Sequence, residues 1–563
     1  MTSKSQALSV ATGDAGGEAS AARSPKNYGR GTAEYRRRQD PWLRNTGGLL
    51  VLIACFFLSS CESQYAYLET AKHIPIQHNG RIKPLDSFSR QTLRLITSTE
   101  NWQRKPAIAV MLEALSDREA IATAKWIRID YFELKETLGV PKNERFFSAV
   151  QLMPGQAKIA ALVQSSQAKR GKDVRPSRLE QKAEELYAKL RTLEGLSSGE
   201  SIRVYPGGSG AAWMSPYTLK ENLSPRFIDL VGLYKDKSFA DFDEQTKLWI
   251  QKIHSLAPEA NPAKLSAEVF YFRLHPFECA AAAYFLAFLL LGLFKRRRSL
   301  HALGLFSLYS AIVFHTLGIA LRVFILSRPP VSNMYESMIF MNWALMIFAT
   351  LFSVIRKNAV AVTAGALASG LVMLYANLLP IDSSMDVVVA VLRSNYWLTI
   401  HVMTVVSSYG AFGLAMALGH RHLILKTLNK FSPAAEEESA HLIERVIQLG
   451  TILIGTGTVL GGVWANESWG RFWGWDPKET WALITFLGYL IVIHLRYTQK
   501  LNNFGLALSS VLGFLLVLMT WYGVNFVLGR GLHSYGQGAG GMNWVVYYLI
   551  LEAVFLGFIL LKK

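Results

Sequence analysis

The stretch WANESWGRFWGWDPKETWAL, residues Trp464 to Leu483, lies between two apolar runs of a 563-residue chain. It holds five of the chain's fourteen tryptophans within eighteen residues. In membrane proteins tryptophan is normally spread along the lipid boundary, where the ring and the indole N–H are both satisfied. The density here exceeds what anchoring requires, which indicates an aromatic surface at the end of a membrane helix. The five residues are Trp464, Trp469, Trp473, Trp475 and Trp481.

Composition indicates a protein that is part membrane and part soluble. Hydrophobic residues make up 51% of the chain and charged residues 18%, a balance unlike that of an ordinary soluble enzyme or of a chain buried wholly in lipid. Runs of about 20 apolar residues, enough to cross a bilayer of roughly 30 Å, recur through the second half. We therefore expect an all-α polytopic membrane bundle of about nine or ten transmembrane helices, with an N-terminal extracytoplasmic, mainly helical domain. The predicted spans are 279–294, 302–326, 335–355, 359–379, 397–418, 446–463, 477–495, 504–528 and 544–561.

Positive charge alternates between the loops that join these spans. Cytoplasmic loops retain Lys and Arg, whereas translocated loops are poorer in them. This pattern places the basic loops inside and the tryptophan stretch, Trp464 to Asp476, outside. The expected localisation is the bacterial inner membrane, with the large domain and the tryptophans on the periplasmic side. The basic segments are 295–298, 356–357, 421–445, 496–500 and 562–563.

The formal net charge of +18 belongs largely to these loops and to the N-terminal tail. A basic surface of this kind faces anionic membrane lipid. We therefore expect membrane lipid, and no nucleic acid, among the partners.

The N-terminal region predicts a tail followed by an export signal. Residues 1–46 are rich in Gly, Ser, Ala and Arg, which is typical of a disordered, basic cytoplasmic lead. Residues 47–63 hold a short apolar run that fits an uncleaved signal anchor. The same run ends in Leu58-Ser59-Ser60-Cys61, which resembles a lipobox, so a lipoprotein signal with lipidated Cys61 is the alternative.

Residues 64–277 are long enough for one extracytoplasmic domain. Leucines recur at helical spacing from Ser177 to Leu196, with Gly195 as a candidate stop. WIRIDYF (126–132) and SIRVYP (201–206) are candidate strands. This part shows no catalytic constellation, so we predict a docking role for it. The membrane domain is predicted over residues 278–563.

Cysteine usage excludes two classes of redox protein. Only Cys55, Cys61 and Cys279 occur, and no Cys-x-x-Cys is present. The chain is therefore neither a thiol oxidoreductase nor itself a covalent c-type cytochrome. No Walker or dinucleotide-binding glycine loop is apparent, which disfavours soluble nucleotide chemistry.

The tryptophan stretch ends in a helix start. Asp476 is a good N-cap, Pro477 fits the first helical position, and Glu479 completes a capping-box pair. Trp469 and Trp473 are four residues apart and would share one face if that segment were helical. The resulting hypothesis is an aromatic platform at the top of a membrane helix, with a re-entrant interfacial anchor as the alternative.

A large, flat, apolar ligand fits such a platform, and haem is the obvious one if axial ligands exist. His401 lies one turn inside the outer end of its predicted helix, and His533 lies in the last outer loop. Both are at the level of the tryptophans, which makes them candidate ligands. His494 lies near the cytoplasmic side and is a candidate haem ligand, with snorkelling of its side chain to the interface as the alternative. His315 lies near mid-membrane, where haem binding and a hydrogen-bonded packing role are both open.

At this point the residues resemble a known family. WGRFWGWD, from Trp469 to Asp476, followed by PKETWALITF, is similar to the tryptophan-rich WWD motif of the CcsA, CcmC and CcmF group of haem-handling proteins of cytochrome c maturation. SRPPVSNMYESMIF (327–340), YWLTIHV and GLHSYG resemble CcsA in particular. The resemblance covers residues 300–561 and implies an activity in cytochrome complex assembly and haem transport.

The resemblance implies a cytochrome c synthase (haem lyase) or its haem-delivering subunit, which presents haem b to the Cys-x-x-Cys-His motif of apocytochrome c. It implies His401 and His533 as catalytic axial ligands beside the tryptophans and Asp476, and His494 as a ligand of a membrane-embedded haem. In the family the partner of that inner histidine comes from CcsB. We therefore expect a CcsB-like membrane subunit, or His315 or His275 in its place.

A membrane di-haem b-type electron-transfer protein is the competing interpretation. It accounts for His315, His494, His401 and His533 as paired ligands on facing helices but gives no reason for the tryptophans. A transporter is a third class, and the broken helices and internal repeat expected of one are not apparent.

Overall fold

A computed structural model of the chain describes residues 63–172, 174, 176–208, 211–217, 226–294, 297–378, 383–386, 394–528 and 541–562. The predicted basic lead and the signal anchor or lipoprotein signal lie outside the described residues. His533 lies outside them as well.

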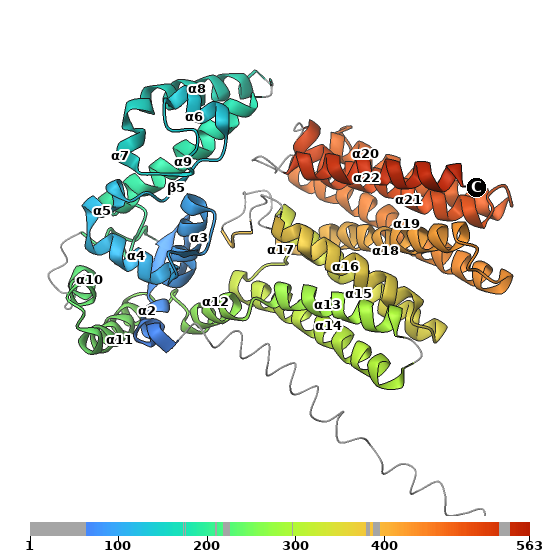
Figure 1. Cartoon of the computed structure of the whole chain (residues 1–563), viewed down its shortest axis with the longest axis horizontal. Helices are drawn as coiled ribbons and strands as arrows, with labels where there is room; N and C mark the ends of the chain where they lie inside the picture. Colours follow the sequence, from blue (N-terminus) through green and yellow to red (C-terminus); the bar gives the residue numbers. More distant parts are fainter. Residues whose placement is uncertain are drawn as a thin grey trace, which may run out of the picture. The chain divides into compact units, whose positions relative to one another are not determined.

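The C-terminal half is a bundle of long helices that lie side by side (Figure 1). Among the described residues, nine helical stretches are long and apolar enough to span a membrane. The prediction of an all-α, multi-pass membrane protein is therefore confirmed. Single helices form most of these stretches: α14 (Arg298–Leu326), α15 (Met334–Arg356), α16 (Val360–Leu378), α19 (Pro433–Trp469), α20 (Pro477–Tyr497) and α22 (Met542–Leu561). The others are made of successive elements: α12 (Pro262–Leu274) and α13 (Pro276–Leu293) form one, α17 (Asn395–Trp397), η4 (Leu398–Val402) and α18 (Met403–Thr427) form another, and α21 (Asn503–Leu518) and η5 (Met519–Leu528) form the last.

Helix α19 is much longer than the predicted span 446–463. It runs for 37 residues, from Pro433 to Trp469. Ser432 caps its start by accepting from the Ala435 amide, with Pro433 at the first helical position. Nothing in ANESW stops the helix, so Trp464 and Trp469 lie in its last turns and not in a loop.

Helix α18 is at the centre of the bundle and packs against α15, α19 and α21, while α13 packs against α14 and α16. One continuous apolar core runs through these helices, from Tyr271 to Ile559. Inside it the rings of Phe412 and Tyr489 stack at 3.7 Å. This stack is a direct contact between α18 and α20.

The N-terminal region is mainly helical and has its own apolar core, from Leu68 to Ala260. Its helices are η1 (Ser63–Leu68), α2 (Glu69–Lys72), α3 (Leu85–Thr97), α4 (Ala107–Ser116), α5 (Arg118–Thr123), α6 (Phe132–Leu138), α7 (Ala149–Leu152), η2 (Met153–Gly155), α8 (Gln156–Arg170), α9 (Arg178–Ser198), α10 (Phe227–Lys235), α11 (Phe239–Leu256) and α12 (Pro262–Leu274). The strands of this region form three two-stranded antiparallel pairs among the described residues. They are β1 (Pro75–His78) with β2 (Arg81–Pro84), β3 (Asn101–Trp102) with β4 (Lys105–Pro106), and β5 (Ile127–Arg128) with β6 (Phe146–Phe147).

The local predictions for this region concern the ends of α9 and two candidate strands, and they are confirmed only in part. Ser177 caps α9 in a full capping box with Glu180, as the sequence indicates. The stop at Gly195 is wrong, because the helix continues to Ser198 and ends at Gly199, whose φ of 78° suits a left-handed C-cap. WIRIDYF contributes the short strand β5, whereas SIRVYP makes only isolated bridges.

Candidate functional site

The tryptophan segment, residues 464–476, changes from helix to irregular backbone at Gly470. This glycine has a φ of 69° and is the C-cap of α19, a conformation that L side chains adopt only with strain. The segment beyond Gly470 is not helical, so Trp469 and Trp473 do not share a helical face. Trp469 ends the helix, and Trp473 lies in the irregular stretch beyond it.

The start of α20 confirms the predicted cap. The Asp476 carboxylate accepts from the Lys478 amide at 2.9 Å. The carboxylate of Glu479 accepts from the amides of Gly474 and Asp476 at 2.8 Å and 3.2 Å. Arg471 donates to the same carboxylate at 3.1 Å. Glu479 therefore fixes both the helix start and the irregular stretch in front of it.

The tryptophan rings form two pairs. Trp464 is buried and stacks on Trp469 with ring centroids 6.4 Å apart. Trp473 meets Trp475 edge to face at 5.8 Å. Trp481, on α20, is half-buried. The five tryptophans therefore do not form one flat face.

Trp475 combines strain with exposure. Its φ is 55°, and 70% of the residue is exposed. A bulky residue in the left-handed region costs free energy, and an exposed ring recovers little of that cost by packing. Strained residues of this kind cluster at functional sites such as active sites and ligand clamps.

His401 lies in η4, a π-helical turn at the start of the span that continues as α18. Its ring lies 5.6 Å from that of Trp464, and its Nδ1 is 2.8 Å from the Gly457 carbonyl oxygen. Because a carbonyl only accepts, Nδ1 is the donor in this contact. A histidine that ligates a metal through Nε2 donates its other ring N–H to a carbonyl in the same way.

A second π-helical segment, η5, ends at Leu528, before the region that holds His533. Trp521 of η5 donates its indole N–H to Ser337 at 2.9 Å, and its carbonyl lies 3.5 Å from Nζ of Lys478. π-helical turns occur frequently at functional sites. The segment that contains His401 and the segment that precedes the region of His533 are therefore both π-helical.

His494 and His315 lie apart from this group. His494 is near the C-terminal end of α20, roughly 27 Å along the helix axis from Asp476, and is exposed. His315 is fully buried, and its two ring nitrogens face the Tyr284 hydroxyl at 3.2 Å and the Ile339 carbonyl at 3.1 Å. These contacts favour the packing role for His315.

A buried charge cluster was not predicted. Arg322 and Arg328 share the carboxylate of Glu336, at 2.9 Å and 2.7 Å, and Glu336 is 1% exposed. His420 likewise pairs with the buried Glu552 at 3.0 Å. The sequence holds one signal for these buried pairs. Arg322 and Glu552 lie inside apolar runs, where charged residues are rare and are functional candidates by default.

The fold and the site define a multi-pass membrane protein in which one end of the helical bundle gathers a histidine, stacked tryptophans and a capped helix start. Residues 331–533 match the family model described as cytochrome c assembly protein. The chain belongs to this family of CcsA-type cytochrome c biogenesis proteins, as its similarity to individual members shows.

Three relatives illustrate the match. The chain is 32% identical to the cytochrome c biogenesis protein CcsA of Guillardia theta and 33% identical to that of Mesostigma viride, in each case over 44% of this chain and 90% of the relative. It is 32% identical to the protein NrfI of Wolinella succinogenes over 82% of this chain. That alignment covers 53% of NrfI, so this chain spans about half of its length.

Proposed function

We propose that this chain acts in cytochrome c maturation by binding haem b between His401 and His533 and presenting it for covalent attachment to apocytochrome c. The observation that supports the proposal most directly is His401, whose Nδ1 faces the Gly457 carbonyl while its ring lies beside Trp464. A carbonyl contact of this kind fixes the orientation of a histidine ring that ligates a metal.

The residues present fit haem as the substrate. The exposed, strained Trp475 offers an apolar ring for stacking. Arg471 is already paired with Glu479, which makes Lys478 the better candidate for a haem propionate. When bound, haem supplies the two vinyl groups across which the thiols of Cys-x-x-Cys-His add. The residues of this chain orient it and hold its iron.

The enzymatic activity that we propose for the chain is that of a haem lyase, which attaches haem covalently to apocytochrome c. His401 and His533 are the residues assigned to it, with Trp464, Trp469, Trp473, Trp475, Trp481 and Asp476 around the haem. The histidine of the incoming apocytochrome replaces one of the two axial ligands, and the vinyl groups stay aligned with its thiols.

His494 is assigned to a second, membrane-embedded haem position. It is exposed on α20, so a ring from a separate CcsB-like subunit has access to it. His315 has both ring nitrogens hydrogen-bonded within the protein, so nothing in its surroundings favours the di-haem electron-transfer alternative.

The proposed setting is the bacterial inner membrane, with the tryptophan segment and residues 64–277 on the periplasmic side and the membrane domain over residues 278–563. Residues 64–277 are assigned a docking role.

The yield of covalent cytochrome c tests the proposal. The chain is co-expressed with an apocytochrome and any required CcsB-like subunit, and His401→Gly is compared with the wild type. The variant is expected to lose nearly all covalent product, because one axial position is vacant. Wild-type yield from His401→Gly would reject the assignment.

A further inference from the structure

The sequence IPIQHNGRIKPLDSFSRQ, residues 74–91, forms a β-hairpin over Pro75–Pro84 and then the first turns of α3. Its strands β1 and β2 pair in antiparallel register, with His78 opposite Arg81. Asn79 and Gly80 have φ values of 49° and 74°, as a tight two-residue hairpin turn requires. Because strand side chains alternate, Arg81 and Lys83 lie on one face of β2.

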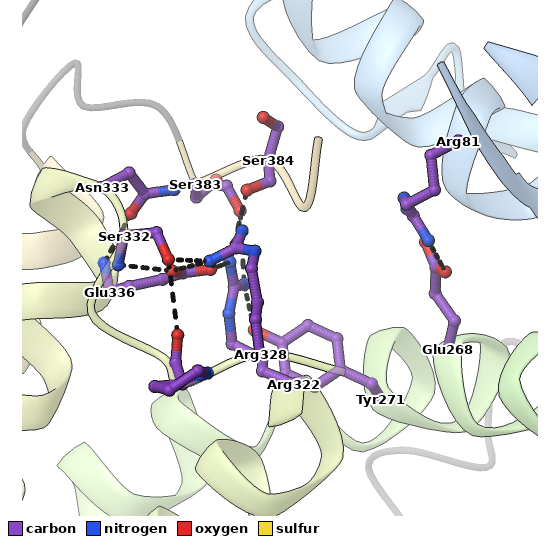
Figure 2. A network of polar contacts seen from close by, with 11 residues as sticks. Arg81, Glu268, Tyr271, Arg322, Arg328, Ser332, Asn333, Glu336, Ser383 and Ser384 are labelled. Atoms are coloured by element: carbon purple, nitrogen blue, oxygen red, sulfur yellow. Dashed lines mark hydrogen bonds and ion pairs between the residues drawn. The ribbon is translucent and has the colours of Figure 1, made fainter. Parts of the chain in front are cut away.

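Both cations of β2 have carboxylate partners outside the hairpin. Arg81 makes a two-pronged pair with Glu268 of α12, at 2.6 Å and 2.7 Å (Figure 2). Nζ of Lys83 lies 2.6 Å from Asp386, in the segment between α16 and α17, and Lys83 is fully buried. Asn79 also donates to Asp386, at 3.2 Å. The hairpin therefore holds residue 386 by two contacts, one of them an ion pair whose lysine is fully buried.

The segment 383–386 also contacts the membrane bundle. Arg322 of α14 donates to the carbonyls of Ser383 and Ser384 at 3.3 Å each (Figure 2). The same guanidinium pairs with Glu336 at 2.9 Å. Arg322 is 2% exposed, so the loop carbonyls replace water as acceptors for its N–H groups.

Glu336 lies in the first turn of α15, and that turn supports η5. Asn333 caps the turn by accepting from the Glu336 amide at 2.7 Å. Ser337 accepts from the indole of Trp521 at 2.9 Å, and Asn525 of η5 lies 3.2 Å from the sulfur of Met334. Arg322 and Arg328 therefore bind the same turn of α15 that η5 contacts.

We propose that Lys83 and Asp386 are positioning residues, through which the hairpin β1–β2 fixes the first turn of α15 and thereby η5, next to the candidate haem site. The physical basis is the burial of Arg322 and Glu336, because a buried guanidinium depends on the loop carbonyls as acceptors for its remaining N–H groups. A loop released by the hairpin leaves donors of Arg322 unsatisfied and loosens the turn. That haem is the ligand rests on the proposed function. The contacts that lead from Lys83 through Asp386 and Arg322 to η5 do not depend on it.

Hydrogen exchange of the full-length protein without haem tests the inference. Lys83→Met and Asp386→Asn are each expected to raise the exchange rate of residues 519–528 by roughly three- to tenfold. The double variant is expected to equal the single ones, because both remove the same contact. Asp386→Glu, which keeps the charge at a partly exposed position, is expected to restore the wild-type rate.

Lys125→Met is the matched control, since Lys125 forms an ion pair with Glu144 at 3.1 Å elsewhere in the same region. It is expected to leave residues 519–528 unchanged. An unchanged rate there in Lys83→Met and Asp386→Asn would overturn the inference, as would fully additive effects in the double variant. If Lys83→Met fails to fold, the near-isosteric Asp386→Asn decides alone. Haem retention by His401→Gly tests the proposed function separately, because the exchange measurement needs no haem.

Discussion

At the residue scale, Gly461 of α19 lies so close to the ring of His401 that a larger side chain has no room there. A Cβ atom on Gly461 would lie 2.6 Å from Cε1 of that ring. Gly461→Ala is therefore expected to turn the imidazole away from the Gly457 carbonyl and lower haem affinity by about tenfold, as loss of an orienting contact does at metal sites. The measurement is haem titration of the purified variant.

Gly557→Ala is the control for this substitution. Gly557 also lies in a membrane helix, and its Cβ would meet nothing within 4 Å. Equal haem affinity of Gly461→Ala and Gly557→Ala would show that the orientation of His401 is not limiting.

His78 makes stability depend on pH. Burial and the nearby Lys83 lower its pKa from 6.5 to about 4. The unfolded chain therefore binds more protons than the folded one between these values, so stability is full above pH 6.5 and falls as the pH drops toward 4. Because the ring is partly exposed, the loss is expected to be about 1–2 kcal/mol.

Urea unfolding of the full-length protein at pH 7 and pH 5 measures this loss. His78→Gln removes the titrating group and should flatten the pH dependence. A midpoint shift that persists in His78→Gln would assign the effect to another group.

At the scale of elements, Glu479 joins the tryptophan segment to α20. Glu479→Ala removes acceptors for the Gly474 and Asp476 amides and the partner of Arg471. The expected local cost is about 1–3 kcal/mol, with weaker haem retention because Trp473 and Trp475 lose their fixed backbone. Haem content of the purified variant is the measurement.

Glu180→Ala is the matched control, since Glu180 occupies the same capping-box position at the start of α9. It should weaken α9 and leave haem content unchanged. If both variants retained haem equally, the ordering of residues 471–475 would be irrelevant to binding.

The elements also show how far sequence reasoning reaches. The cap at Asp476 was predictable because its partners lie within three residues of it. The end of α19 was misjudged, since the left-handed conformation of Gly470 is visible only in the folded backbone. Arg322 and Glu336 were missed because their pairing depends on the packing of α14 against α15 and not on any local pattern.

At the scale of the whole molecule, the alternation of basic loops predicts which ends of the helices face the cytoplasm. Pro433 begins α19 in a basic loop and is expected inside, whereas residue 171, between α8 and α9, is expected outside. Alkaline phosphatase fused at residue 171 should be active, and the same enzyme fused at Pro433 should be inactive. Activity at Pro433 would invert the proposed orientation of the tryptophan segment.

The number and type of the membrane helices were predictable because apolar runs of about 20 residues are a length requirement of the bilayer. The contact between the hairpin at 79–83 and residue 386 was not, because it joins positions some three hundred residues apart. The same holds for the approach of His401 to Trp464, which requires α18 and α19 to pack together.

The central claim is that His401 holds haem iron beside the tryptophans. Its most direct test is the Soret absorbance of the purified His401→Gly variant, with and without imidazole. We expect the variant to lose most of its haem and added imidazole to restore part of it, because free imidazole occupies the vacant axial position. Trp475→Gly should lose haem without such rescue, since it lacks a stacking surface and not a ligand. A His401→Gly variant with the wild-type haem content and spectrum would show that His401 does not hold the iron.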